Sequence, residues 1–212
     1  MSPTYLYCLT AHAAPDPPAG TMGLDGEAVR RLGDAWVSDV ASRSIRATVE
    51  RIRAHDAVVS VALNTGSTPL PARFGQTFAS DAECVEVISA KHEATSAGLA
   101  RVAGMVEMTL LFRVEATALD ASSGTAYLGS LARRQHTVES MRRASRELDA
   151  RLGDCIRGSA QGGSENTVTL SHLVEREALA MYLERVKTLT NGLDVRVIGP
   201  GAPYSFAFAP PE

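Results

Sequence analysis

Three absences narrow the function of this chain of 212 residues. No apolar run approaches the roughly 20 residues that a membrane-spanning helix requires. The start of the chain, Met1 to Cys8, has neither the basic residues nor the apolar stretch of a secretory signal. A basic excess is also missing, because the formal net charge is −3, whereas domains that bind nucleic acid usually carry a basic face. We therefore expect a cytoplasmic protein that binds neither membrane nor nucleic acid.

Cysteine is scarce, and the motifs of common catalytic centres are missing. Cys8, Cys84 and Cys155 lie far apart without CxxC spacing, which fits neither a disulfide framework nor a zinc site, so we expect reduced, mostly buried thiols. The five histidines share no metal-ligand spacing with each other or with a cysteine. No phosphate-binding glycine loop and no GxSxG nucleophile motif occur. The sequence therefore predicts no metal site, no cofactor and no catalytic centre.

The first half of the chain reads as a small unit of strands and helices. Hydrophobic residues make up 45% of the whole sequence, which is enough for proper cores. Apolar patterns and turn residues predict a strand over 5–9, a loop over 13–26, short strands over 29–32 and 35–40, and a helix over 45–63. Pro69 and Pro71 allow only an edge strand or extended loop over 68–76. Ser80 and Glu83 form a capping box that opens a further helix ending near Gly104.

The second half begins with the clearest strand in the sequence, the strict alternation of apolar and other residues over 106–114. This strand is followed by a turn at 120–124 and a helix of about 30 residues with an apolar seam. After these the sequence predicts a flexible break over 158–163, a strand over 167–174, a helix over 179–189 and a strand over 193–197. This order is typical of helices on one face of a mainly antiparallel sheet, as in ferredoxin-like folds. We therefore predict an α+β fold with an N-terminal domain over 1–80, a linking helix over 81–103 and a ferredoxin-like domain over 104–212.

Six short segments, in order over nearly the whole chain, carry a family pattern. They are Tyr5–Tyr7, Gly23–Gly26, His55–Val58 with Leu70–Gly75, Gly104–Met108, Gly124–Leu128 and Gly199–Phe206. Together they resemble the GvpF/GvpL family of gas vesicle proteins. Three features depart from its pattern. Cys8 stands where the family usually has glycine, and Gly201-Ala202 replaces a bulky residue and a proline. The segment Gly158 to Glu165 is short where the family pattern leads us to expect a further strand.

The resemblance implies a two-domain α+β protein that takes part in building gas vesicles, the protein-walled, gas-filled organelles that give buoyancy. It implies contact with the small hydrophobic wall protein GvpA or with other accessory Gvp proteins, as an assembly factor or a minor wall component, and no enzymatic activity. Both branches of the family, F and L, fit the sequence. The candidate partner-binding residues are those of the matched motifs that suit turns and aromatic anchors: Arg73, Phe74, Gly75, Tyr127, Tyr204 and Phe206. For each of them, a purely structural role is the alternative.

Two other functions stay open at this point. A non-catalytic scaffold would self-associate through the long amphipathic helix from Tyr127 to Ile156. A small-molecule enzyme of ferredoxin-like architecture would use Glu107, His55 and Tyr127 in a cleft between the two halves. A deep pocket with converging titratable side chains would favour the enzyme.

Overall fold

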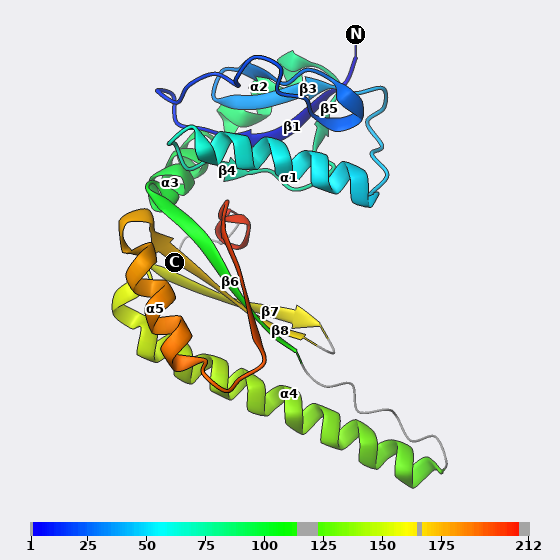
Figure 1. Ribbon diagram of the computed structural model, residues 1–212. Coiled ribbons are helices and arrows are strands. Elements are labelled where there is room, and N and C mark those ends of the chain that lie inside the picture. Colours follow the sequence, from blue (N-terminus) through cyan, green and yellow to red (C-terminus); the bar gives the residue numbers. More distant parts are fainter. Residues whose placement is uncertain (1, 114–122, 165–166, 208–212) are drawn as a thin grey trace. The chain divides into compact units, whose positions relative to one another are not determined.

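The computed structural model describes residues 2–113, 123–164 and 167–207 (Figure 1). The chain divides into two compact units, residues 1–106 together with the chain from Gly201 onward, and residues 107–200. The segment 81–103, expected as a linking helix, lies within the first unit, and so does the C-terminal tail of residues 201–207. That each unit folds as an independent domain stays a prediction.

The first unit is built on a five-stranded antiparallel sheet. Its strand order is β2-β3-β1-β4, and β5 also pairs with β1; the strands are β1 (Thr4–Leu9), β2 (Arg30–Leu32), β3 (Ala35–Asp39), β4 (Leu70–Pro71) and β5 (Thr77–Phe78). The central strand β1 is buried on both faces because its side chains alternate between two helical layers. Tyr5 and Tyr7 contact His55 of α1 (Val49–Asn64), whereas Leu6 packs with Cys84 of α2 (Asp81–Ala90). The opening strand and the two short strands predicted from the sequence are confirmed.

The helix ends follow local capping chemistry. α1 begins after Thr48, whose side chain accepts from the amide of Arg51 at 3.3 Å, so the helix starts four residues later than predicted. The predicted capping box is present at α2: the Ser80 hydroxyl accepts from the amide of Glu83 at 3.3 Å, and the Glu83 carboxylate accepts from the amide of Ala79.

The single helix expected from 80 to 104 is wrong, because α2 and α3 (His92–Val102) are separate helices that meet at Lys91. The backbone of Lys91 leaves the helical region (φ −108°, ψ 18°), and the axis changes direction there (Figure 1). Past this junction α3 runs close to β4, because a Cβ atom at Gly98 would lie only 3.1 Å from the Leu70 side chain. Packing on the sheet therefore decides where α2 ends.

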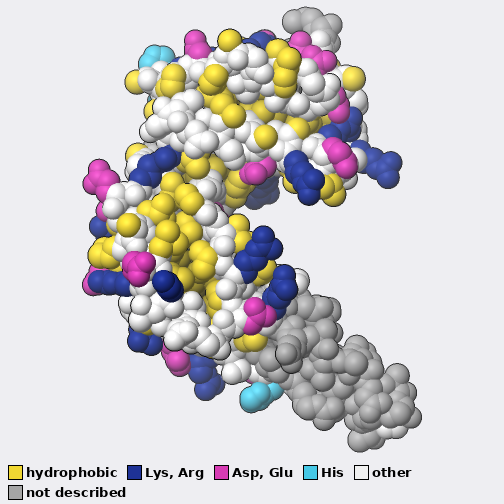
Figure 2. Space-filling view, viewed as in Figure 1, with side chains coloured by type: hydrophobic (Ala, Val, Ile, Leu, Met, Phe, Trp, Pro, Cys, Tyr) yellow, Lys and Arg dark blue, Asp and Glu magenta, His cyan; other side chains and the backbone are white. Residues whose placement is uncertain are grey.

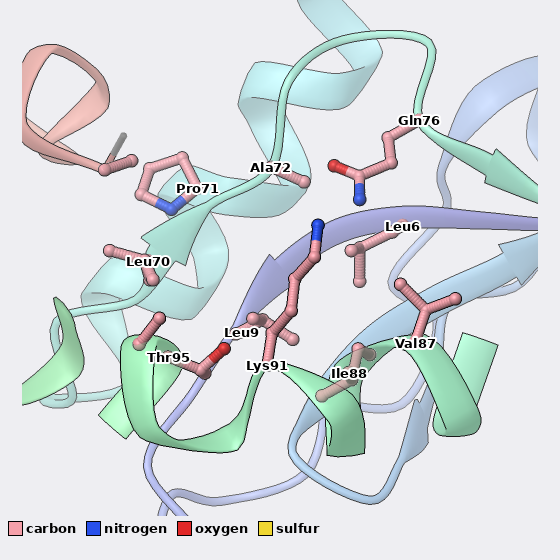
Figure 3. Close-up of a pocket in the computed structure, with 12 residues that line it drawn as sticks. Leu6, Leu9, Leu70, Pro71, Ala72, Gln76, Val87, Ile88, Lys91 and Thr95 are labelled. Carbon is pink, nitrogen blue, oxygen red and sulfur yellow. The ribbon is translucent and has the colours of Figure 1, made fainter. Parts of the chain in front are cut away.

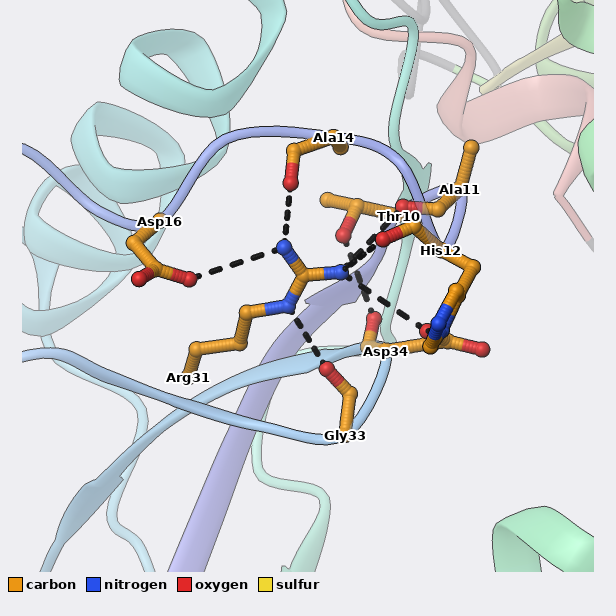
Figure 4. A network of polar contacts seen from close by, with 8 residues as sticks. All are labelled: Thr10, Ala11, His12, Ala14, Asp16, Arg31, Gly33 and Asp34. Carbon is orange, nitrogen blue, oxygen red and sulfur yellow. Dashed lines mark hydrogen bonds and ion pairs between the residues drawn. The ribbon is translucent and has the colours of Figure 1, made fainter.

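The partly buried guanidinium of Arg31 fixes the loop after β1 to the hairpin of β2 and β3 (Figure 4). Arg31 donates from Nε to the carbonyl of Gly33 at 2.7 Å and from Nη2 to the carbonyl of His12 at 2.7 Å. Its Nη1 atom donates to the carbonyl of Ala14, and Asp34 lies 3.7 Å from Nη2. One side chain thus satisfies several carbonyls of a loop that has few backbone partners of its own.

The second unit has a four-stranded sheet in the order β7-β8-β6-β9. Its elements are β6 (Met105–Arg113), α4 (Gly124–Leu152), η2 (Gly153–Cys155), β7 (Gly158–Ser164), β8 (Thr167–Glu175), η3 (Arg176–Ala178), α5 (Leu179–Leu189) and β9 (Val195–Gly201). Alternate residues of β6, from Val106 to Phe112, are buried, which confirms the predicted strand. His172 of β8 contacts both Asp149 of α4 and Tyr182 of α5, so both helices lie on one face of the sheet. In the face that Figure 2 shows, apolar side chains gather near α5, and Met181 and Leu183 of this helix are partly exposed.

Two predictions for the second unit are wrong. The segment 158–163, expected as a flexible break, forms β7, which pairs with β8 from Gly158 opposite Leu173 to Ser164 opposite Thr167. β7 has three glycines and no large apolar residue, so its hydrogen-bonded partner defines it rather than its own pattern. The bounds predicted for the last strand, 193–197, are also wrong, because β9 runs from Val195 to Gly201. Gly199 has φ +117°, and a Cβ there would lie 2.7 Å from the carbonyl oxygen of Glu107. The turn predicted at 120–124 lies mostly outside the described residues.

Candidate partner-binding site

A buried group of aromatic rings lies between β1 and α1. Tyr5 projects from β1 toward His55 of α1, and its hydroxyl lies 2.8 Å from His55 Nδ1. The same hydroxyl accepts from the amide of Gly75 at 3.1 Å. Burial raises the pKa of Tyr5 far above its ordinary value of 10.0 and lowers the pKa of His55 below 6.5. Both side chains are therefore neutral at pH 7.

The loop over 72–76 is clamped onto this cluster. The amide of Ala72 donates to the carbonyl of Tyr7 at 2.8 Å, and the carbonyl of Gln76 accepts from the amide of Leu6 at 3.0 Å. Between these anchors Gly75 adopts φ +85°, a left-handed conformation that favours glycine. The turn sets the ring of Phe74 5.9 Å from His55 in edge-to-face contact, while Arg73 is exposed. The predicted role of Gly75 in a tight turn is thus supported by its backbone angle.

The C-terminal tail completes the site. Its short helix η4 (Tyr204–Phe206) brings the ring of Tyr204 to 6.3 Å from that of His55. Burial raises the pKa of Tyr204 far above 10.0, and the neighbouring carboxylate of Asp56 raises it further. Phe206 is buried, and its carbonyl accepts a hydrogen bond from Arg101. Tyr204 is therefore part of the site, whereas Phe206 holds the tail on the first unit.

These groups border a cavity of about 500 Å³, which we call the α1 cavity. Its wall is mainly apolar, and both of its arginines belong to exposed positions. The lining residues come from α1, the loop over 72–76 and the tail: Ile52, Arg53, His55, Asp56, Ala72, Arg73, Phe74 and Tyr204. An apolar wall with a few polar groups is typical of a binding site.

The structure brings three of the six predicted binding residues together at this cavity, namely Arg73, Phe74 and Tyr204. Gly75 supports the loop through its bond to Tyr5. Tyr127 lies on α4 in the second unit, and its side chain is outside the described part of the chain.

Three wall residues of α1 were not among the predicted binding residues, namely Ile52, Arg53 and Asp56. The signal for two of them was present, because Ile52 and Asp56 lie four residues apart and hence on one helix face. Nothing in the local sequence indicated that this face borders a loop and a distant tail.

The groups named for an enzyme are divided between the two units. His55 belongs to the first unit and Glu107 to the second. The side chain of Glu107 is buried, and its Oε1 accepts from the hydroxyl of Thr109 at 3.3 Å.

A second chain of titratable groups, which the sequence did not reveal, runs from the partly exposed Asp149 to the buried His172 and Tyr182. His172 Nδ1 lies 2.7 Å from the Tyr182 hydroxyl, and Nε2 lies 3.2 Å from Asp149 Oδ1 without the alignment of a hydrogen bond. Burial lowers the pKa of His172, and the charge of Asp149 partly counteracts this. His172 and Tyr182 are both fully buried, so they form part of the core of the second unit.

Two further observations concern other classes of site. In the described ranges, no three or more His, Cys, Asp or Glu side chains gather in a way that could hold a metal ion. Across those same residues, none of the helices has both the length and the apolar character needed to cross a bilayer. All three cysteines are buried and free, as predicted.

The fold is that of two solved gas vesicle proteins. The crystal structure of GvpF from Anabaena sp. PCC7120 aligns with a TM-score of 0.75 at 18% identity and covers 99% of this chain and 98% of that one. The crystal structure of GvpF from Microcystis aeruginosa aligns with a TM-score of 0.73 at 17% identity, over 99% of this chain and 100% of that one. The shared architecture is an α+β protein with two antiparallel sheets.

Sequence comparison defines the family. The family model for the gas vesicle synthesis protein GvpL/GvpF matches residues 3–207. Gas vesicle protein L of Streptomyces sp. (strain CB03234) is 28% identical over an alignment of 248 residues that covers 96% of this chain and 92% of the relative. The chain belongs to the gas vesicle protein GvpL/GvpF family, as the six motifs predicted.

Proposed function

We propose that this protein acts in gas vesicle assembly, or stays at the vesicle as a minor wall-associated component, by binding GvpA or another accessory Gvp protein. Its family membership supports a role in gas vesicle synthesis. Binding rather than catalysis is the proposed mode of action. No cofactor takes part in it.

The observation that carries the binding role is the α1 cavity. Ile52 on its wall is 48% exposed, and Val49, one turn earlier on the same helix face, is 58% exposed. Ile52 and Phe74 form an apolar wall of the cavity beside Arg53 and Arg73. An apolar pocket with arginines at its edge has the composition of an interface hot spot, and a small hydrophobic wall protein offers the matching surface.

The loop over 72–76 is prepared for this contact. The bond from the Gly75 amide to Tyr5 and the ring contact of Phe74 with His55 hold it in one conformation. A partner that meets a loop already in place loses less conformational entropy than one that must order it. Arg73 and Phe74 are therefore the residues on which we expect binding to depend most.

The test is co-expression of the tagged protein with GvpA and with each other Gvp protein, followed by affinity capture. We expect the wild type to capture one partner, and the Arg73→Ala, Phe74→Ala double variant to capture at least about tenfold less. The control is Arg46→Ala, Val85→Ala, which removes one exposed arginine and one exposed apolar side chain elsewhere in the first unit. Circular dichroism checks that both variants fold.

Two outcomes would count against the proposal. Failure of every pairing with well-folded protein would refute the binding role. Equal capture by the wild type and the Arg73, Phe74 variant would refute the α1 cavity as the contact.

The second unit enters the proposal in two ways. Its strand–helix–strand–strand–helix–strand order and its strand order β7-β8-β6-β9 support assignment to the ferredoxin-like class. Tyr127 stays a predicted partner residue. Self-association through α4 also stays a prediction, and sedimentation at several protein concentrations tests it.

A further inference from the structure

A second cavity, of about 200 Å³, lies in the first unit between the sheet and the junction of α2 with α3 (Figure 3). We call it the Lys91 cavity. Its apolar walls include Leu6, Leu70, Val87 and Ile88. Ala72 borders both this cavity and the α1 cavity, so the chain over 70–76 separates the two.

The mouth of the Lys91 cavity is polar. Lys91 lies at the break between α2 and α3, and its side chain runs along the cavity toward the 72–76 loop (Figure 3). Within the described ranges, no carboxylate forms an ion pair with its ammonium group. The side chains of Gln76 and Thr95, which also border the cavity, make no hydrogen bond there either. These three groups are therefore available to an incoming ligand.

Size and charge together define what fits. An apolar cavity of about 150 Å³ holds a benzene ring, so about 200 Å³ admits one bulky apolar side chain but no folded segment. The ammonium beside it attracts a carboxylate and repels a cation. An uncharged group of the ligand would bury the Lys91 ammonium without replacing the hydrogen bonds that the ammonium makes to water. The ligand that fits this cavity is therefore an apolar group with a carboxylate a few ångströms away.

We propose that the Lys91 cavity receives one bulky apolar side chain of a partner gas vesicle protein, whose neighbouring acidic side chain pairs with Lys91. This inference rests on the proposed function for the class of partner. It adds a second anchor on the opposite side of the loop that carries Arg73 and Phe74. The partner would then hold the loop from both sides.

The chain offers a clean probe of the chemistry, because it has only two lysines, Lys91 and Lys187. Reductive methylation with ¹³C-formaldehyde labels both of them and the terminal amine, and NMR resolves each signal. We expect octanoate to shift the Lys91 signal at concentrations about tenfold lower than octanol or octylammonium, with Lys187 unchanged. Equal shifts of both lysines, or equal potency of octanol, would overturn the proposed chemistry.

Charge reversal tests the partner. In the co-expression assay, Lys91→Glu should lower capture about tenfold, Lys187→Glu should leave it unchanged, and an acid-to-lysine change in the captured partner should restore binding to Lys91→Glu. Unchanged capture by Lys91→Glu would overturn the inference. If the Arg73, Phe74 variant still lost capture in that case, the proposed function would stand. Octanoate binding with unchanged capture would show a small-molecule site and would also overturn the docking role.

Discussion

The hydroxyl of Tyr5 joins the core of the first unit to the loop of the candidate site, so its removal is the most informative single change. Tyr5→Phe keeps the ring and opens no large cavity. It leaves two groups without partners, His55 Nδ1 and the amide of Gly75. A buried polar group that loses its partner costs about 1–3 kcal/mol. Because the Gly75 amide is only partly buried, we expect a total loss of about 2–4 kcal/mol from the free energy of unfolding.

Two measurements on the Tyr5→Phe variant test this expected loss of stability. Urea denaturation gives the free energy of unfolding of the unit that contains Tyr5, and hydrogen exchange reports the Gly75 amide, which should exchange faster in the variant. Capture of a partner should weaken as well, although Tyr5 is fully buried and touches no partner. Its effect would come through loss of loop order.

Tyr182→Phe is the matched control, because it removes a buried hydroxyl that lies 2.7 Å from a histidine nitrogen in the second unit. It should lower stability by about 1–3 kcal/mol and leave both Gly75 exchange and partner capture unchanged. A loss below about 0.5 kcal/mol in Tyr5→Phe, or unchanged exchange at Gly75, would refute the reasoning.

Three further results are expected. The pKa of His172 in the folded protein lies below its ordinary value of 6.5, so on acidification the unfolded chain binds the proton first. The contribution of His172 to stability is therefore full above pH 6.5, and below that pH the free energy of unfolding should fall by up to about 1.4 kcal/mol per pH unit. In a pH series of unfolding measurements, His172→Gln should give a flatter curve than the wild type. Arg31→Ala should lower the free energy of unfolding by about 1–3 kcal/mol and make the loop after β1 sensitive to limited proteolysis. Arg30→Ala removes only surface ion pairs and should lower it by less than about 1 kcal/mol. Equal losses of stability in the two variants would contradict the role of the Arg31 hydrogen bonds. Gly75→Ala should lower the free energy of unfolding by about 1–2 kcal/mol because of the left-handed backbone at this position, although nothing lies within 4 Å of the added Cβ. Gly153→Ala has equal space and no positive φ, so its stability in thermal denaturation should be nearly that of the wild type.

Local chemistry in the sequence was sufficient for many elements and for part of the site. The alternation in β6 and the hydroxyl cap of Ser80 act within a few residues, so they are visible without the fold. The same holds for the turn at Gly75, where glycine is the residue that readily takes a positive φ. Arg73 and Phe74 could be named because they flank this turn in a family motif.

What the sequence alone determined is therefore the α+β class, the family and the loop of the candidate site. The tertiary structure decided the rest, because those features depend on contacts between distant segments. Pairing with β8 makes a strand of the glycine-rich segment 158–164, and packing on the sheet divides the predicted helix at Lys91. Both cavities exist because the loop over 72–76 lies between α1, the α2–α3 junction and a tail that joins from residue 201. Local sequence patterns do not predict such contacts, because they determine the secondary structure of each segment separately, and only tertiary packing places the segments side by side.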